Sequence, residues 1–456
     1  MAVTEPASAP SAVPEEAQRG ILRRQSLRES AARTYARSLP IVPVRARGIT
    51  IEGADGRRYL DCLSGAGTLA LGHNHPVVLE AVRKVIDSGA PLHVLDLATP
   101  VKDAFTTELF ATLPQEFADD ARIQFCGPAG TDAVEAALKL VRTATGRQGL
   151  LAFTGAYHGM TAGALGASGG ATDVRVTRLP FPQDYRCPFG VGGDRGAELG
   201  ARWTEALLDD PKGGVPTPAG MILEPVQGEG GVIPAPDAWM RRMRRITEER
   251  GIPLVVDEVQ TGVGRTGTFW AVERSGVRPD VMVLSKAIGG SLPLAVVVYR
   301  SALDVWQPGA HAGTFRGNQL AMAAGAATLA FVRENRLADH AATLGARMLG
   351  RLQGLAAAHP SIGDVRGRGL MIGVELVDPA DSTPDALVPP PAPALAAAVQ
   401  RACLDRGLIV ELGGRHSAVV RLLPPLTLTD DQAEAVLDRF ADALAAAEGA
   451  AVQGSP

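Results

Sequence analysis

The stretch that decides the fold covers residues 253–286 and reads PLVVDEVQTGVGRTGTFWAVERSGVRPDVMVLSK. It holds two short apolar runs of the kind that form buried strands, and a glycine-rich passage follows the first of them. The first run ends at Asp257, and the second ends just before Lys286. Open α/β sheets build their sites at the carboxyl ends of their strands, so we expect both side chains at such an edge.

A carboxylate and an amine placed in this way suit one cofactor in particular. Pyridoxal 5'-phosphate (PLP) is held as a Schiff base to a lysine, with an aspartate on its pyridine nitrogen. The aspartate keeps that nitrogen protonated, because an opposite charge within about 4–6 Å favours the charged form. A buried structural aspartate and a surface lysine would give the same two strand ends, and the pair alone does not decide.

Composition sets the broad class. The chain has 456 residues, 46% of them hydrophobic and 21% charged, which is typical of a globular protein with two or three structural units. A formal net charge of -4 argues against a nucleic-acid partner, and no apolar run is long enough to span a membrane. The four cysteines are widely spaced and no secretory signal is visible, so we expect a cytoplasmic protein with reduced thiols and no zinc site.

The order of strand and helix patterns predicts an α/β domain with a mostly parallel sheet, followed by a smaller C-terminal α+β domain. Apolar runs alternate with helix patterns from about residue 100 to 330, as in parallel βαβ units. The last helix opens with a capping box of Thr429 and Gln432. The expected units are a disordered tail (1–20), an N-terminal segment that packs with the small domain (21–75), a large PLP-binding domain (76–330) and the small domain (331–456).

Two further strand ends carry candidate cofactor contacts. Residues 126–131 read CGPAGT before a helix pattern, and small residues there let backbone N–H groups and the helix dipole reach a phosphate, with Thr131 adding a hydroxyl. A tight strand–helix turn without a ligand also uses Gly130, and the pattern matches neither a dinucleotide nor an ATP loop. Tyr157 can stack on a flat ring, although a core tyrosine is the more ordinary interpretation.

Several motifs together resemble a known family. The segments are DEVQTG at 257–262, GRTG at 264–267, SKAIGG at 285–290 and GTFRGN at 313–318. In this order, and over nearly the whole chain after about residue 25, they resemble the class III (ω-amino) aminotransferases, which are PLP-dependent transferases of fold type I. Residues 128–131 depart from the Ser-Gly-Ala that many members carry, but the change leaves the backbone donors in place.

The resemblance implies a role for each matching residue. Lys286 would form the Schiff base and act as the proton carrier, Asp257 would pair with the pyridine nitrogen, and Gln260 would bind near the ring hydroxyl. Gly130 and Thr131 would hold the phosphate, and Tyr157 would stack on the ring. Thr314 would reach the phosphate of a neighbouring subunit, so the resemblance also implies a homodimer with shared active sites.

A finer resemblance concerns the substrates. Residues 61–76, 90–96, 291–294 and 411–416 are similar to the subgroup that transfers the 4-amino group of L-2,4-diaminobutyrate to 2-oxoglutarate, giving L-aspartate 4-semialdehyde and L-glutamate reversibly. Arg421 matches the arginine that binds the α-carboxylate of glutamate, as a bidentate pair would. Glu229 matches the glutamate that neutralises this arginine when the substrate presents a distal amine.

Other residues and other functions remain open at this point. Tyr35 and Arg415 are candidates for the far end of the diamine, with a structural role equally expected. His73 and His75 have metal-like spacing, but we expect them to stabilise a turn. The competing functions are another ω-amine donor (ornithine, lysine or 4-aminobutyrate), a semialdehyde aminomutase, and a non-catalytic PLP-fold binding protein, against which Lys286 and Asp257 together argue.

Overall fold

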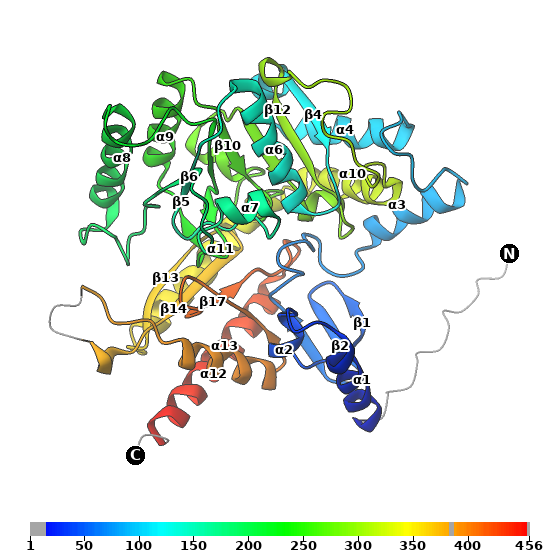
Figure 1. Ribbon diagram of the computed structural model, residues 1–456. Helices are drawn as coiled ribbons and strands as arrows, with labels where there is room; N and C mark the ends of the chain where they lie inside the picture. The colour runs from blue at the N-terminus through cyan, green and yellow to red at the C-terminus, as the bar shows by residue number, and fades with distance from the viewer. Residues whose placement is uncertain (1–14, 383–386, 454–456) are drawn as a thin grey trace.

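The computed structural model of the chain describes residues 15–382 and 387–453 (Figure 1). Most of the expected disordered tail, residues 1–14, lies outside the described residues. Residues 15–20 of that segment belong instead to helix α1 (Glu15–Arg28). Part of the proline-rich passage, residues 383–386, is also outside the described residues.

A seven-stranded sheet forms the centre of the larger part of the molecule, in the order β4-β12-β11-β10-β7-β5-β6. Only β12 runs antiparallel to its neighbours. Every residue of β5, β7, β10 and β11 is buried, which is why these strands read as continuous apolar runs. The strands are β4 (Ala121–Phe125), β5 (Leu150–Phe153), β6 (Val176–Leu179), β7 (Gly220–Leu223), β10 (Leu254–Asp257), β11 (Val281–Leu284) and β12 (Val296–Arg300).

Helices cover both faces of this sheet. Successive residues of β10 point into different clusters, Val255 into one with α6 (Gly130–Thr145) and α7 (Ala162–Ala167), and Val256 into the main core. The alternation follows from the two-residue period of a strand. The remaining helices of this part are α3 (Pro76–Asp87), α4 (Pro100–Thr112), α5 (Gln115–Ala118), α8 (Gly193–Asp209), α9 (Asp237–Glu249) and α10 (Gln319–Glu334), with short 3-10 helices η1 (Ala271–Ser275), η2 (Lys286–Gly289) and η3 (Ser301–Leu303).

The C-terminal part is a four-stranded sheet in the order β13-β14-β17-β16, flanked by three helices. The expected domain boundary at residue 330 falls inside α10, which continues to Glu334 and packs against α3, α4 and η2. The C-terminal elements are β13 (Ile362–Arg368), β14 (Met371–Leu376), β16 (Glu411–Gly413), β17 (Val419–Leu422), α11 (Leu337–Ala356), η4 (Pro379–Asp381), α12 (Pro393–Asp405) and α13 (Asp430–Gln453).

The last helix begins as the sequence predicts. The Thr429 backbone N–H donates to Gln432 Oε1 at 3.1 Å, and the Gln432 N–H donates to Thr429 Oγ1 at 3.3 Å. This reciprocal pair satisfies two N–H groups that a helix start would otherwise leave free, and it confirms the predicted capping box.

The N-terminal strands lie beside the C-terminal part (Figure 1). The strands β1 (Pro43–Arg47), β2 (Thr50–Gly53) and β3 (Arg58–Asp61) form an antiparallel meander, and β3 pairs in parallel with β15 (Leu408–Ile409). The strands β2 and β3 therefore form a hairpin. Short elements complete the fold: α2 (Tyr35–Ser38), β8 (Val226–Gln227) and β9 (Ile233–Pro234).

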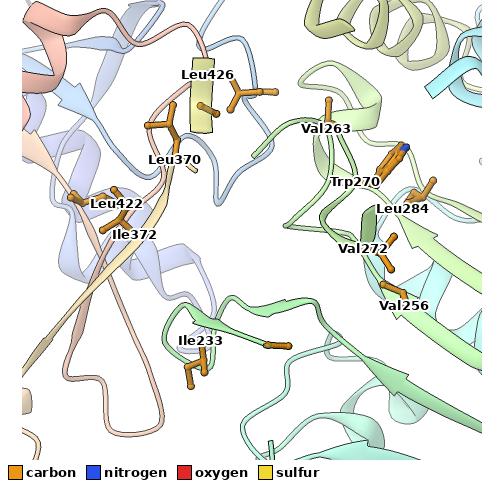
Figure 2. Packing of buried hydrophobic residues seen from close by; sticks show 14 of the residues in the cluster. Ile233, Val256, Val263, Trp270, Val272, Leu284, Leu370, Ile372, Leu422 and Leu426 are labelled. Atoms are coloured by element: carbon orange, nitrogen blue, oxygen red, sulfur yellow. The ribbon is translucent and has the colours of Figure 1, made fainter. Parts of the chain in front are cut away.

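The large and small parts share one core. Figure 2 shows Leu370, Ile372, Leu422 and Leu426 of the C-terminal part on one side and Trp270 with its neighbours on the other, all members of one buried cluster. Shared apolar burial of this kind fixes where the C-terminal strands lie relative to the central sheet. Among the described residues, no helix combines the length and the hydropathy needed to cross a bilayer.

Candidate active site

The carboxyl ends of β10 and β11, which carry Asp257 and Lys286, meet in one cavity. Strands β10 and β11 are parallel neighbours, and Asp257 lies in register with Val283, three residues before Lys286. The cavity has a volume of about 280 Å³. Its lining includes most of the predicted site residues, namely Gly130, Thr131, Tyr157, Glu229, Asp257, Gln260 and Lys286.

Lys286 has an unusual backbone and an unusual amine. Its φ of 52° lies in the left-handed region, which a non-glycine residue adopts at a cost of about 1–3 kcal/mol and which is concentrated at functional sites. Burial lowers the pKa of the Lys286 amine, while Glu229 opposes that shift and Arg421 adds to it. A lowered pKa leaves more of the amine neutral, which is the form that acts as a nucleophile or base.

Asp257 is held by a histidine to which the sequence analysis gave no role. Its Oδ2 lies 2.7 Å from Nδ1 of His158, and its Oδ1 accepts a hydrogen bond from the Val259 N–H at 3.0 Å. Burial alone would lower the pKa of His158, but the hydrogen bond and the charge of Asp257 outweigh it and the net shift is upward. The contact therefore holds the Asp257 carboxylate in a fixed orientation.

Glu224 is a second residue whose position the sequence did not predict. Its carboxylate accepts hydrogen bonds from the N–H groups of Tyr157 and Gly228, both at 3.0 Å. Burial raises the pKa of Glu224 to about 7; the neighbouring His158 opposes this shift and Asp257 adds to it. The side chain lines the cavity and ties the loop after β5 to the loop after β7.

The start of α6 borders the cavity and is closely packed. A Cβ added at Gly130 would lie 3.0 Å from Cγ1 of Val259, and one added at Gly159 would collide with the Thr131 hydroxyl. The Thr131 and Thr161 hydroxyls are 2.6 Å apart. Because Gly130 has no side chain, the backbone N–H groups at this helix start are accessible to an anionic ligand in the cavity.

These donors fit PLP. The cavity offers an amine, a carboxylate, a helix start and the half-buried ring of Tyr157, which is 42% exposed. Gln260 donates to the Ala66 carbonyl at 3.1 Å, and its own Oε1 is buried without a hydrogen-bond partner among the described residues. The cavity therefore offers an amine for the aldehyde of PLP, a carboxylate for its ring nitrogen, a helix start for its phosphate and an amide for its ring hydroxyl, so the residues present suit this cofactor.

Arg421 lies behind Glu229 and is fully buried. Its Nη2 donates to Glu229 Oε2 at 2.8 Å, and the same nitrogen is 2.6 Å from Glu411 Oε2 in an ion pair that is not aligned as a hydrogen bond. The Nε and Nη1 atoms of Arg421 have no hydrogen-bond partner among the described residues. Burial, which would lower the pKa of Arg421, is outweighed by Glu229 and Glu411, so the pKa rises and the charge is retained.

The remaining candidates separate into two groups. Tyr35 lies close enough to interact with Glu411, Glu229 and Arg421, and so belongs to the arginine cluster. Arg415 donates to the Thr154 carbonyl at 2.8 Å and does not line the cavity, and Thr314 is exposed and also outside it. His73 binds Asp61 at 2.8 Å, which matches the turn role predicted for it.

Comparisons with known proteins identify the family. The family model for class III aminotransferases matches residues 31–444. A protein of Rhizobium meliloti named diaminobutyrate–2-oxoglutarate aminotransferase is 56% identical, over 93% of this chain and 92% of its own length. A protein of the same name from Haemophilus influenzae is 47% identical, over 92% of this chain and 93% of its own length.

Solved structures agree with this assignment. An amine transaminase from an uncultivated Pseudomonas species, in a PLP-bound form, superposes with a TM-score of 0.80 at 30% identity, covering 92% of this chain and 97% of that one. An ω-transaminase from Thermomicrobium roseum gives a TM-score of 0.83 at 27% identity, covering 94% and 98%. The chain therefore belongs to the class III aminotransferases and is a PLP-dependent aminotransferase of fold type I.

Proposed function

We propose that this aminotransferase moves the 4-amino group of L-2,4-diaminobutyrate to 2-oxoglutarate, giving L-aspartate 4-semialdehyde and L-glutamate, in either direction. The names of the relatives at 56% and 47% identity support the choice of substrates. The structural observation that carries it is the contact between Arg421 and Glu229 at the edge of the cavity.

That contact suits an enzyme that must accept two unlike substrates in one site. Arg421 has no exposed surface, whereas the Glu229 side chain is 32% exposed and lines the cavity. The α-carboxylate of glutamate can reach the guanidinium only after Glu229 moves aside, and it then takes over the charge-assisted hydrogen bond. The carbon of diaminobutyrate that reacts carries no carboxylate, so Glu229 stays and neutralises Arg421.

The lining of the cavity supports the cofactor-side roles that we propose. When bound, PLP supplies an electron sink for the substrate carbon that loses its proton. Lys286 would hold the cofactor and would take and return the proton at that carbon, and Asp257 would pair with the ring nitrogen and favour its protonated form. Gly130 and Thr131 would hold the phosphate, Gln260 would bind beside the ring hydroxyl and Tyr157 would stack on the ring.

We also propose a homodimer in which Thr314 completes the partner's phosphate site. Thr314 is exposed and lies outside the cavity of its own chain. Large apolar side chains are exposed next to it and at the cavity edge: Phe315 at 70% and Met160 at 67%. Apolar exposure of this kind is typical of a surface that another subunit covers.

The four cysteines are free, in keeping with a cytoplasmic enzyme.

Donor profiling tests the substrates. The PLP-loaded protein is given 2-oxoglutarate with diaminobutyrate, ornithine, lysine or 4-aminobutyrate, and glutamate formation is measured. We expect the highest kcat/KM with diaminobutyrate, and a higher value with any other donor would overturn the assignment. Turnover without any added keto acid would instead indicate an aminomutase. A Lys286→Ala protein should be inactive with every donor, and sedimentation velocity tests the dimer.

A further inference from the structure

Glu411 is a second carboxylate on Arg421, and its position is fixed by the fold. Glu411 lies directly opposite Arg421 in the antiparallel pair β16–β17, so both side chains point to the same face of the sheet. Glu411 is 7% exposed, and its carboxylate lies near Tyr35. Glu229, by contrast, lies in the loop between β8 and β9, and its side chain borders open space.

The two carboxylates share one nitrogen. Arg421 Nη2 is 2.8 Å from Glu229 and 2.6 Å from Glu411. One guanidinium therefore faces two carboxylates, and the cluster carries one negative charge in excess when both are ionised. If Glu229 moves aside for a substrate carboxylate, Glu229 still borders the same cavity, so the substrate brings a third carboxylate to a site that holds one guanidinium.

We propose that Glu411 sets how tightly Arg421 holds a dicarboxylate substrate, because Glu411 must take up one proton when that substrate binds. The inference rests on the proposed function, since it requires Arg421 to bind the carboxylate of glutamate or 2-oxoglutarate. Glu411 acts through Arg421 and is a positioning residue.

Proton uptake is the cheapest way for the buried cluster to accept another anion. Two carboxylates that share a site without water cannot both remain ionised at low cost, so one of them binds a proton. Glu411 is the candidate, because burial already raises its pKa; Arg421, Tyr35 and Lys286 oppose that rise and Glu229 adds to it. The Tyr35 contact survives protonation, since a phenol hydroxyl can donate or accept.

The consequence for turnover is that the enzyme binds dicarboxylate substrates weakly. Above the pKa of Glu411 in the free enzyme, each dicarboxylate must bring a proton with it, so binding weakens by about tenfold per pH unit. The same excess negative charge favours the cationic diamine. Glu411 therefore keeps glutamate from blocking the site that diaminobutyrate must enter in the next half-reaction.

The test uses glutarate, a dicarboxylate that carries no amine or ketone and so cannot react. Calorimetric titration of the PLP-loaded enzyme in two buffers of different ionisation enthalpy gives both the Kd and the number of protons taken up. We expect uptake of close to one proton at pH 8, and a Kd that rises with pH. Binding of glutarate without net proton uptake would overturn the proposal.

Two carboxylate variants separate the roles. Glu411→Gln keeps the shape and the Tyr35 contact, and it should bind glutarate about tenfold or more tightly at pH 8, with no proton uptake and a flat pH dependence. Glu229→Gln should also bind glutarate more tightly, but with proton uptake retained. An unchanged or weaker affinity in Glu411→Gln would sink the idea, and a gain in affinity cannot arise from a damaged fold.

Two further variants keep the outcomes distinct. Tyr35→Phe, at an exposed position, removes a hydroxyl that favours ionised Glu411, so glutarate should bind more tightly with less proton uptake. If it binds as in the wild type, Glu411 is not the proton acceptor. Arg421→Lys should lose glutarate binding; if it does not, the dicarboxylate site of the proposed function is itself wrongly assigned. Donor profiling that fails to favour diaminobutyrate would overturn the amine substrate and leave the glutarate result standing.

Discussion

The imidazole of His158 lies 2.7 Å from the carboxylate of Asp257, and both side chains are almost completely buried. Their contact joins the loop after β5 to the end of β10, so it fixes the carboxylate relative to the cavity. Removing the imidazole should let Asp257 turn and should leave the Val259 N–H as the remaining hydrogen-bond donor to its carboxylate. We expect His158→Ala to weaken PLP binding by about 10-fold to 100-fold, the size of one lost hydrogen bond to a charged group.

The chain supplies a matched control for this prediction. His73 and Asp61 form a second histidine–aspartate pair at 2.8 Å, away from the cavity. His73→Ala should change the stability of the fold without changing the Kd for PLP, measured by absorbance titration of the apoprotein. Equal losses of PLP affinity in the two variants would show that the effect of His158 is a general one on stability.

A second prediction concerns the space beside Arg421. A Cβ added at Gly413 would lie 2.6 Å from Nε of Arg421 and 2.8 Å from its Cδ, so the arginine would have to move. Gly413→Ala should therefore raise the KM for 2-oxoglutarate by about tenfold or more, because a displaced guanidinium loses its bidentate geometry. Steady-state kinetics with 2-oxoglutarate as the varied substrate measures this.

Gly350 provides the comparison. It lies in α11, and a Cβ there would meet nothing within 4 Å. Gly350→Ala should leave the KM unchanged and raise stability by about 0.5–1 kcal/mol through its better helix propensity. If Gly413→Ala keeps the wild-type KM, then Arg421 is not held in the position that carboxylate binding requires.

A third prediction follows from Glu258, which is buried beside the active-site strand. Its carboxylate accepts hydrogen bonds from the Val272 N–H at 2.8 Å and from the Thr261 hydroxyl. Burial raises the pKa of Glu258 to about 7, and these hydrogen bonds oppose the shift. The folded chain thus binds this proton more tightly than the unfolded chain does. The resulting stabilisation is complete below pH 4.5 and is lost as pH rises towards 7.

The variant Glu258→Gln tests this sign, because an amide resembles the protonated acid. Relative to this variant, the wild-type free energy of unfolding should fall between about pH 4.5 and pH 7, by on the order of 3 kcal/mol in total. Urea unfolding of the apoproteins at several pH values gives the difference. A constant difference across that range would contradict the raised pKa.

The sequence predicted the meeting of Asp257 and Lys286 because each follows an apolar run that can only be a buried strand. It could not predict His158 or Glu224 as their neighbours, since those contacts join loops from distant strands. His158 and Asp257 are 99 residues apart, and periodicity does not say which loops meet. The pairing of Glu411 with Arg421 was in principle accessible, but a three-residue strand ending in glycine gives too weak a pattern to set a register.

The expected domain boundary at residue 330 was misplaced because the sequence does not show which part of the fold α10 packs against. The alanine-rich pattern of α10 runs on through Arg333 and Glu334, and Asn335 is the first residue outside the helix. The helix belongs with the large part because it packs against the turn that carries Lys286. Hydrophobic periodicity specifies a helix, but its packing partner depends on tertiary structure.

The last prediction concerns Arg265, which the family motif contains but to which the sequence analysis gave no role. Its side chain is 2% exposed, and Nη1 donates to the Leu370 carbonyl at 3.0 Å and to the Pro424 carbonyl. Those carbonyls belong to the C-terminal part, so one guanidinium connects it to the loop after β10. Arg265→Met should leave both acceptors unsatisfied and lower the free energy of unfolding by about 2–4 kcal/mol.

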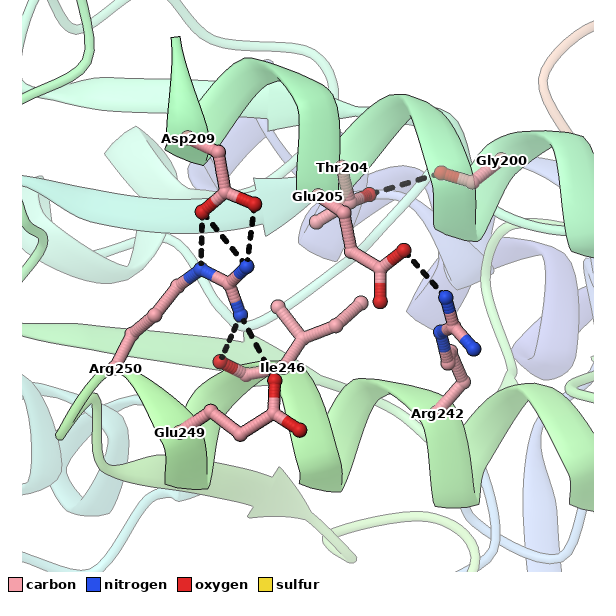
Figure 3. Close-up of polar contacts among 8 residues, drawn as sticks. All are labelled: Gly200, Thr204, Glu205, Asp209, Arg242, Ile246, Glu249 and Arg250. Carbon is pink, nitrogen blue, oxygen red and sulfur yellow. Dashed lines mark hydrogen bonds and ion pairs between the residues drawn. The ribbon is translucent and has the colours of Figure 1, made fainter. Parts of the chain in front are cut away.

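Arg250 is the matched surface arginine. Figure 3 shows it spanning α8 and α9, with hydrogen bonds to Asp209 at 2.7, 2.8 and 3.0 Å. The Asp209 side chain is 61% exposed, so water competes for the pair. Arg250→Met should therefore cost about 1 kcal/mol or less. Urea unfolding of the two PLP-free variants compares them directly. Because Arg250 makes more ion-pair contacts and Arg265 is more deeply buried, a larger loss in Arg250→Met would show that the number of contacts, rather than burial, decides the contribution of an arginine to this fold.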